Sequence, residues 1–424
     1  MMENNKPILS IVVPTCNRQE CFLIITRIMT KFDYLNFEIV VHDCSDAPLD
    51  PVKQEQFTKD SRVKYYYKPK LSMAENWAEA LTYVCGEYVV YIGDDDCVFP
   101  SIFPVVQFMK DNNIDALVPI LRTIYFWPSD DRTGVTETAY NDITTGGMRK
   151  FNVKDELDRY LTSSDIYYYP YGLPRTYNGI VSKKILDIAI EKYGKVFGSI
   201  SPDMFSTIIL SRIVKEVHQL DYPIILPGVS PKSGTAIHSK KVLMEGNLVD
   251  NNPITNGGQP GYIPTGMVPN IRTDINIWGE ARYAALLLMD DKESINKIDV
   301  EKYCSILYNQ CKSKKIHIFL REYWKDNNIG VKGWLKFTKL RIRDAYFSKN
   351  TLRRFKHWII KIAVNKHNPL KPLMKYFYAK LRKATSHEDV LNIGEAVNIV
   401  MKNVIPVDEL LKCIETPLKE DVVK

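Results

Sequence analysis

The chain has 424 residues, of which 45% are hydrophobic, so it can bury a large core but is too long for one ordinary domain. Its eight cysteines form no CxxC pair, which argues against a zinc site or a disulfide framework and favours reduced thiols in a cytosolic protein. We expect no signal peptide, and no apolar run approaches the ~18 residues needed to span a bilayer.

The net charge of +7 is unevenly distributed along the chain. Residues 312–383 contain 21 Lys or Arg and three acidic residues, so the rest of the chain is net acidic by 11 charges. A strongly basic segment of this kind predicts an anionic partner for that part of the chain, such as a membrane surface or nucleic acid.

Strands alternate with helices in the N-terminal part. The β-branched run ILSIVV, ended by Pro14, predicts a buried strand followed by a turn. Ser72, with Glu75 three residues later, predicts a capping box at the start of a helix. This alternation indicates βαβ units and a mostly parallel sheet. In chain order we expect strand 8–13, helix 19–32, strands 37–43 and 63–68, helix 72–85, and strands 87–93 and 114–121.

The composition changes after residue 226. Residues 227–270 hold seven of the 20 glycines and six of the 23 prolines, which predicts a long loop able to order over a ligand. From about Trp278 onward helical patterns dominate. We therefore predict a catalytic domain over 1–240, a Gly/Pro-rich loop or linker over 241–277 and a helical region with basic amphipathic helices over 278–424.

Three aspartates follow an apolar run in YIGDDDCVFP, residues 91–100. Ligands of an α/β sheet bind beyond the carboxyl ends of its strands, where these side chains would lie. Neighbouring carboxylates become tolerable when a hard divalent cation such as Mg²⁺ or Mn²⁺ lies among them. The alternative is a solvated acidic turn that caps the next helix.

The order of several short motifs resembles that of family 2 glycosyltransferases, which are inverting enzymes of the GT-A fold. SIVVPTCNR at 10–18 is followed by Asp43 after the second strand, then by SMAENWAEAL, GEYVVYIGDDD and Pro100. The resemblance covers about residues 8–240. It implies a Rossmann-like, mostly parallel GT-A domain, followed here by a mainly helical basic region, with a nucleotide-sugar donor and Mn²⁺ or Mg²⁺.

The resemblance leaves the register of the metal motif open. Spacing alone offers Asp94 and Asp96, which point the same way in an extended chain. Alignment to Pro100 instead makes Asp95 the chief metal ligand and puts Asp94 beside the ribose. We favour this register and keep Asp94 and Asp96 as candidate ligands. The family also implies a histidine at the metal or diphosphate, and His238 is at the matching place, with Lys232, Lys240 and Lys241 nearby to meet phosphate.

For donor binding, the resemblance points to the first two strand ends and to the helix before the acidic motif. Asp43 matches an acid that reads the nucleobase or ribose, although His42 and Cys44 replace its usual neighbours, and it could instead cap its own loop. Asn17 and Arg18 could equally cap the following helix. The implied donor-binding residues are Pro14, Thr15, Asn17, Arg18, Asp43 and Asn76.

Inverting transfer needs a base for the acceptor hydroxyl. In the family this acid begins a helix after the metal motif, which here selects Asp203, with Pro202 in place of the family's usual Glu. A helix N-terminus lowers a carboxyl pKa whereas burial raises it, so burial must prevail for Asp203 to act as the base. The Tyr-rich stretch 167–184, which includes Arg175, predicts a sugar-binding loop.

The predicted function is therefore transfer of a sugar, from a UDP-sugar by preference, to a glycan or lipid-linked acceptor of cell-surface polysaccharide synthesis. Stretches 333–347, 351–364 and 370–383 combine apolar stripes with cations, which suits a cytoplasmic protein held peripherally on the anionic inner face of the cell membrane. They could instead pack on their own core.

The sequence leaves two alternative functions, a sugar-1-phosphate nucleotidylyltransferase and a non-catalytic scaffold. For the favoured glycosyltransferase we expect no nucleic-acid partner. A sugar-1-phosphate nucleotidylyltransferase would need a Gly-rich loop that VPTCNRQE lacks, and a non-catalytic basic scaffold would bind nucleic acid or lipid.

Overall fold

A computed structural model describes most of the catalytic half of the chain and parts of the remainder. The described residues are 6–128, 135–139, 146–162, 172–231, 262–271, 274–301, 314–326, 384–387 and 392–402, with a few isolated positions after residue 231. The predicted basic helices between 333 and 383, and most of the predicted loop 241–277, lie outside the described residues.

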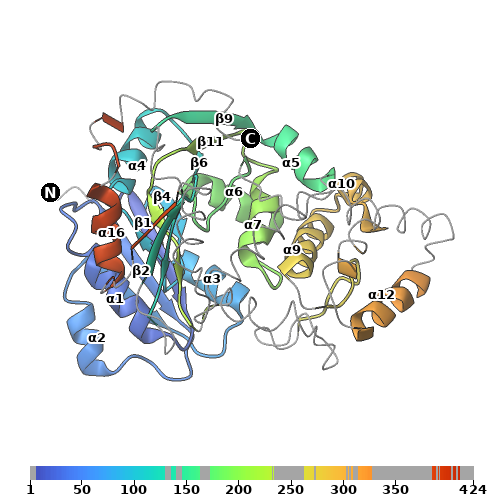
Figure 1. Ribbon diagram of the computed structural model, residues 1–424, viewed down its shortest axis with the longest axis horizontal. Coiled ribbons are helices and arrows are strands. Elements are labelled where there is room, and N and C mark those ends of the chain that lie inside the picture. Colours follow the sequence, from blue (N-terminus) through green and yellow to red (C-terminus); the bar gives the residue numbers. More distant parts are fainter. Residues whose placement is uncertain are drawn as a thin grey trace, which may run out of the picture.

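The central feature is an eight-stranded sheet with the strand order β3-β2-β1-β4-β10-β6-β11-β9 (Figure 1). β1 runs parallel to β2 and β4, and β6 runs parallel to β11, whereas β10 and β9 are antiparallel to their neighbours. The predicted α/β class with a mostly parallel sheet is confirmed. The strands are β1 Leu9–Thr15, β2 Phe37–Asp43, β3 Val63–Tyr67, β4 Tyr88–Tyr91, β6 Ala116–Pro119, β9 Met148–Asn152, β10 Ile180–Ser182 and β11 Glu216–Leu220.

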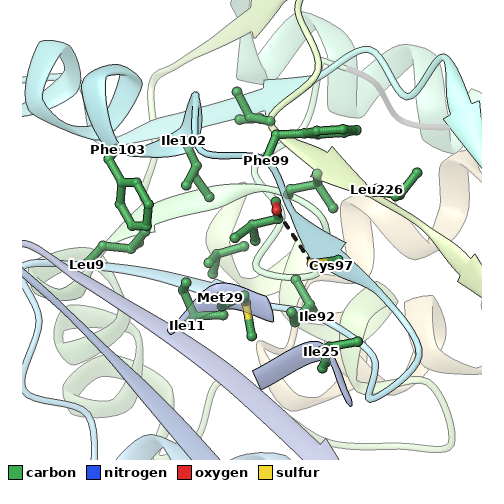
Figure 2. Close-up of a cluster of buried hydrophobic side chains, with 14 of the residues drawn as sticks. Leu9, Ile11, Ile25, Met29, Ile92, Cys97, Phe99, Ile102, Phe103 and Leu226 are labelled. Atoms are coloured by element: carbon green, nitrogen blue, oxygen red, sulfur yellow. Dashed lines mark hydrogen bonds between the residues drawn. The ribbon is translucent and has the colours of Figure 1, made fainter. Parts of the chain in front are cut away.

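Both faces of the sheet are covered, which is why its strands read as continuous apolar runs. Successive β1 side chains point to opposite faces. Ile11 and Val13 belong to a core shared with α1 and α4, part of which Figure 2 shows, while Val12 belongs to the core on the other face, shared with α3 and α7. The helices are α1 Gln19–Met29, α2 Pro51–Phe57, α3 Met73–Thr82, α4 Ile102–Asp111, α5 Val153–Thr162, α6 Lys183–Tyr193 and α7 Pro202–Leu210.

The first strand is longer than predicted. It continues through Pro14 to Thr15, because β2 pairs with β1 to its end, with Thr15 opposite Asp43. Pairing between β1 and β4 stops at Val12. Pro14 therefore lies beyond the last hydrogen bond on that side of β1, where a residue without an N–H disrupts no pairing. The helix predicted over 19–32 ends at Met29, and α2 and α4 were not predicted.

Two small sheets lie beside the main one. The first pairs β5 Cys97–Val98 with β12 Ile225–Leu226. The second has the order β13-β7-β8-β14, with β13 Gly228–Val229, β7 Thr123–Phe126, β8 Val135–Ala139 and β14 Ala384–His387. These sheets hold the segment around Gly228 next to the segment that follows β4.

The C-terminal region is largely helical, as predicted, but it does not form one separate body. α9 Asp274–Leu288 packs on α7, and α10 Lys292–Lys297 and α12 Lys314–Asp326 follow it. α16 Ile393–Lys402 returns to lie beside α1 at the opposite side of the molecule (Figure 1). The predicted boundary at residue 278 falls inside α9. Within the described residues, no helix is both long and apolar enough to cross a bilayer.

The predicted capping box at α3 is present and supplies a direct test. The Ser72 hydroxyl accepts from the Glu75 amide at 3.3 Å, and the Ser72 amide donates to Glu75 Oε2 at 2.8 Å. Ser72→Ala should lower the free energy of unfolding by about 1 kcal/mol, because one orphan amide loses its acceptor. Urea denaturation measures the change. Ser72→Thr, which keeps the oxygen, should retain most of the stability, and equal losses in both variants would contradict the capping role.

Candidate active site

The carboxyl ends of β1, β2 and β4 meet at one edge of the sheet and bring the predicted donor residues together. Thr15 ends β1, Asp43 ends β2, and the acidic triplet, Asp94 to Asp96, follows β4. All five of these side chains are buried. Because the three strands are parallel neighbours, residues far apart in sequence converge there, as expected for a ligand site of an α/β sheet.

Asp96 is held by the protein on both oxygens. Oδ1 accepts from the Gly228 amide at 2.7 Å, while Oδ2 accepts from the Gly93 amide at 2.7 Å and from the Tyr177 hydroxyl at 2.8 Å. Burial and the neighbouring charge of Asp95 raise its pKa to about 6 against these donors. These hydrogen bonds fix the turn after β4, and the role of Asp96 as a candidate metal ligand stays a prediction.

Asp94 faces the first strand. Its Oδ2 accepts from the Thr15 hydroxyl at 2.6 Å, and its Oδ1 forms an ion pair with Arg18 Nη2 at 2.6 Å. Burial raises its pKa to about 7 although the Arg18 charge acts in the opposite direction. Arg18 stands at the N-cap position of α1 but its side chain makes no capping bond, so the predicted alternative of a helix cap does not apply to it.

Asp95 differs from its neighbours because one of its oxygens remains open. Oδ2 accepts from the Ser230 amide at 3.0 Å and from Arg18 Nη1 at 3.3 Å. No donor among the described residues reaches Oδ1. The Asp95 carbonyl accepts from Trp127 Nε1 at 2.8 Å, and the Gly228 backbone packs directly on it. The peptide of Asp95 is therefore fixed, while Oδ1 of its buried carboxylate accepts no hydrogen bond from the described residues.

The arrangement could hold a divalent cation through Asp95 Oδ1. No group of three or more His, Cys, Asp or Glu side chains suited to a metal occurs among the residues described here. Mg²⁺ commonly takes only one or two carboxylates and completes its shell with water and substrate phosphates. A one-carboxylate site at Asp95 fits that chemistry. His238, the other predicted ligand, lies outside the described residues, as do Lys240 and Lys241.

Asp43 has its acceptor sites filled by its own surroundings. Oδ1 accepts from the Ser45 amide at 2.9 Å and from the Ser45 hydroxyl, and Oδ2 accepts from Gln19 Nε2 at 2.9 Å and the Tyr65 hydroxyl at 2.8 Å. This geometry favours the loop-organising alternative. A nucleobase contact would require one of these donors to be exchanged.

Two amides tie the strand ends together. Asn17, at φ 57°, donates its backbone N–H to Ser45 Oγ at 2.7 Å and accepts from the Asp46 amide at 3.1 Å, which joins the loops after β1 and β2. Asn76 on α3 donates to the Thr15 carbonyl at 3.1 Å. Its amide oxygen contacts His42 Nδ1 at 2.5 Å. Asn17 and Asn76, which were predicted to bind the nucleotide sugar, therefore connect the loops of the site through hydrogen bonds. Pro14 lies buried in β1.

Asp203 occupies the first turn of α7, as predicted, next to Pro202. Burial raises the pKa of this half-buried carboxyl and prevails over the Ser201 hydroxyl, which donates to Oδ1 at 2.5 Å, over the first-turn amides and over the charge of Arg175. The effect of burial on the pKa of Asp203 thus exceeds that of the helix N-terminus, and the raised pKa is the condition set above for Asp203 to act as a base.

Tyr177 connects the two acidic parts of the site. Its hydroxyl binds Asp96, its pKa is raised well above the ordinary value by burial and by the charges of the triplet and Asp203, and its ring lies 5.8 Å from that of Trp77. The Tyr-rich stretch was flagged in the sequence, but this contact was not. Trp127 carried no sequence signal, and Gly228 was noted only as one of the glycines in the stretch 227–270.

A cavity of about 770 Å³ is lined by Arg18, Trp127 and Ser230, which contact the triplet, whereas the three aspartates themselves do not line it. It is bordered by the loops that follow β1 and β2 and by the small sheet, and its walls include Asn17, Arg18, Ser45, Trp127 and Ser230. Arg18 therefore lies between the cavity and the buried carboxylates.

The glycosyl transferase family 2 model matches residues 10–159. This segment contains β1, β2, β4 and the whole triplet. Over these residues the chain is similar to family 2 glycosyltransferases. Together with the sheet order, this establishes the GT-A fold that the motifs implied. The matched segment ends before Asp203, so the family 2 match itself covers the donor side of the site only.

Relatives of the chain are distant. WcaA of Escherichia coli strain K12, described as a putative colanic acid biosynthesis glycosyl transferase, is 34% identical over 99 residues, covering 22% of this chain. The chain spans about a third (34%) of that relative's length. A solved structure of residues 1–349 of S. aureus TarS with UDP-GlcNAc has 14% identity and a TM-score of 0.40, covering 93% of this chain and 91% of that one. Another TarS structure has 13% identity and a TM-score of 0.39, covering 79% and 55%.

The close approach of Gly228 to the triplet predicts a position that tolerates no side chain. A Cβ there would lie 1.7 Å from the Asp95 carbonyl oxygen. Gly228→Ala should therefore push Asp95 out of place, lower the free energy of unfolding by about 1–3 kcal/mol and abolish manganese-dependent UDP binding, measured by calorimetry.

Gly194→Ala is the matched control for this substitution. Gly194 has φ 76° and no neighbour within 4 Å of an added Cβ, so it should cost backbone strain of about 1–2 kcal/mol while UDP binding persists. Normal UDP binding by folded Gly228→Ala would show that the contact does not position Asp95.

Proposed function

We propose that this protein is a metal-dependent inverting glycosyltransferase that moves a sugar from a nucleotide-sugar donor, a UDP-sugar by preference, to a glycan or lipid-linked acceptor in cell-surface polysaccharide synthesis. The observation that carries the proposal is the convergence of two carboxyls whose charges both act on Tyr177. One is Asp95, whose Oδ1 accepts no hydrogen bond from the described residues, and the other is Asp203, a half-buried carboxyl of raised pKa. The description of WcaA as a biosynthetic glycosyl transferase supports the choice of pathway class.

Asp95 would hold Mn²⁺ or Mg²⁺ through Oδ1, and Asp94 would lie beside the donor ribose. When bound, the cation supplies charge neutralisation for the diphosphate leaving group. The donors around Asp96 keep the turn in place and cost no reorganisation during the reaction, which is what electrostatic preorganisation requires.

Asp203 acts as the base in this proposal. It takes the proton of the acceptor hydroxyl as that oxygen bonds to the anomeric carbon from the face opposite the diphosphate. The bond to the diphosphate breaks, its electron pair leaves with the nucleoside diphosphate, and the anomeric configuration inverts. One positioned base contributes roughly 10²–10⁴ in rate. Arg175, whose charge acts on Asp203, would keep the carboxyl pKa from rising too far for it to ionise.

The basic surplus of residues 312–383 supports a location at the inner face of the cell membrane. Each cation near an anionic surface contributes about 1 kcal/mol, so a segment with 21 basic and three acidic residues could hold the enzyme there even if few of its cations reach the surface. A lipid-linked acceptor would be met at the same surface.

Ligand-dependent thermal stability tests the donor part of the proposal. With Mn²⁺ present, UDP should raise the melting temperature of the wild-type protein and a UDP-sugar should be turned over, because a ligand that binds only the folded state stabilises it. Asp203→Asn should keep the UDP-induced shift but lose at least about 10² of kcat, since only the base is removed. The absence of any shift with UDP or GDP would leave the non-catalytic scaffold as the better description.

The pH profile gives this test a second readout. Asp203 works deprotonated and its pKa is raised, so kcat should fall on acidification at a pH above the ordinary range of an aspartate. Asp187→Asn, at an exposed position on α6, is the control and should leave both the rate and the profile unchanged. Full activity of Asp203→Asn would overturn the base assignment.

Membrane binding is best tested by neutralising charges, because truncation after residue 330 would remove α16 and its buried side chains on α1. Four Lys→Gln changes in the basic segment should reduce flotation with phosphatidylserine vesicles, and four in the catalytic domain should not. Equal flotation of both sets would rule out the segment as the membrane anchor. The first set is Lys371, Lys375, Lys380 and Lys383, and the control set is the exposed Lys31, Lys53, Lys59 and Lys154.

A further inference from the structure

Arg18 has an unusual position for a residue at a helix start. Its guanidinium reaches back across the carboxyl edge of the sheet, with Nη2 2.6 Å from Asp94 Oδ1 and Nη1 3.3 Å from Asp95 Oδ2. Nη1 also donates to Ser230 Oγ at 3.3 Å. One side chain thus spans two carboxylates that belong to the same acidic turn.

The ion pairs of Arg18 compensate the negative charge of the buried triplet. Among the residues that the structure describes, Arg18 is the only basic side chain in an ion pair with Asp94, Asp95 or Asp96. Asp94 is 0% exposed and Asp95 4% exposed, and carboxylates so deeply buried need a partner of opposite charge. Arg18 therefore supplies in the free protein what a divalent cation would supply in the complex.

We propose that Arg18 is an internal counter-cation that competes with the divalent metal for Asp95, so that the metal binds tightly only when a nucleoside diphosphate draws Arg18 away. The inference rests on the proposed function. A guanidinium 3.3 Å from one oxygen of Asp95 repels a cation approaching the other. The diphosphate removes that obstacle, because phosphate is a preferred bidentate partner of arginine.

The cavity gives the released guanidinium a place to go. Arg18 lines the 770 Å³ cavity and its side chain is 22% exposed, so it can turn away from the carboxylates without repacking the core. Ser230, which binds Asp95 through its amide and Arg18 through its hydroxyl, borders the same cavity. By thermodynamic linkage, if the nucleotide raises the affinity for the metal by some factor, the metal raises the affinity for the nucleotide by the same factor.

Manganese binding without nucleotide tests the inference, followed as loss of the electron paramagnetic resonance signal of free Mn²⁺. Arg18→Gln should bind Mn²⁺ at least about tenfold more tightly than wild type in the absence of UDP, because the competing charge is gone. The enhancement of Mn²⁺ affinity by UDP should shrink correspondingly. Arg18→Lys, which keeps the charge, should stay close to wild type.

Arg122→Gln is the matched control, since Arg122 Nε pairs at 2.5 Å with Asp221, another fully buried carboxylate, which is not part of the triplet. Its Mn²⁺ affinity should be unchanged. If Arg18→Gln does not fold, Arg18→Gln combined with Asp94→Asn replaces the buried ion pair by neutral amides and should still bind Mn²⁺ more tightly than wild type.

The outcomes separate this inference from the proposed function. If Arg18→Gln binds Mn²⁺ in the absence of UDP no more tightly than wild type does, while UDP still promotes Mn²⁺ binding to wild type, Arg18 does not compete and the inference is wrong. If no variant binds Mn²⁺ even with UDP, the metal-dependent function fails and the inference falls with it. Tighter binding by Arg18→Gln alone supports both.

Discussion

The burial of three consecutive carboxylates at the end of β4 is the constraint on which the rest of the site depends. Unpaired charges in such surroundings would cost several kcal/mol each, so every neighbouring segment contributes a donor or a cation. β1 supplies Thr15, the loop after it supplies Arg18, the segment beside β4 supplies Tyr177, and the start of β13 supplies the Gly228 amide. The three aspartates thereby acquire different roles although their side chains are chemically identical.

Much of the fold could be predicted because its signals are local. Apolar runs at residues 8–13 and 37–43 predicted the first two strands, and Ser72 with Glu75 predicted the start of α3. The helices α2 and α4 were not predicted. No residue of α2 is buried, so it has no apolar face, and α4 contains Pro104 in its first turn, a residue that more often marks a break. Strand ends also moved where pairing, rather than the residue itself, decides the limit, as at Pro14.

The roles of individual residues within the candidate site were harder to predict from the sequence. That both oxygens of Asp96 are occupied depends on Tyr177 and Gly228, which follow it by 81 and 132 residues. Asp43 illustrates the same limit, because the donors to its Oδ2 come from α1 and β3. A linear pattern can place a carboxylate at the correct edge of a sheet, but it does not count the hydrogen bonds that carboxylate has already made.

The position of α16 against α1 has a consequence for how the protein is made. Ile393, Ala396, Val397 and Val400 complete the core on the α1 face of the sheet, whose first strand begins at Leu9. A chain emerging from the ribosome carries that apolar surface uncovered until residues 393–402 have been synthesised. The N-terminal strands can therefore pair early, yet the final packing of this core must wait for α16.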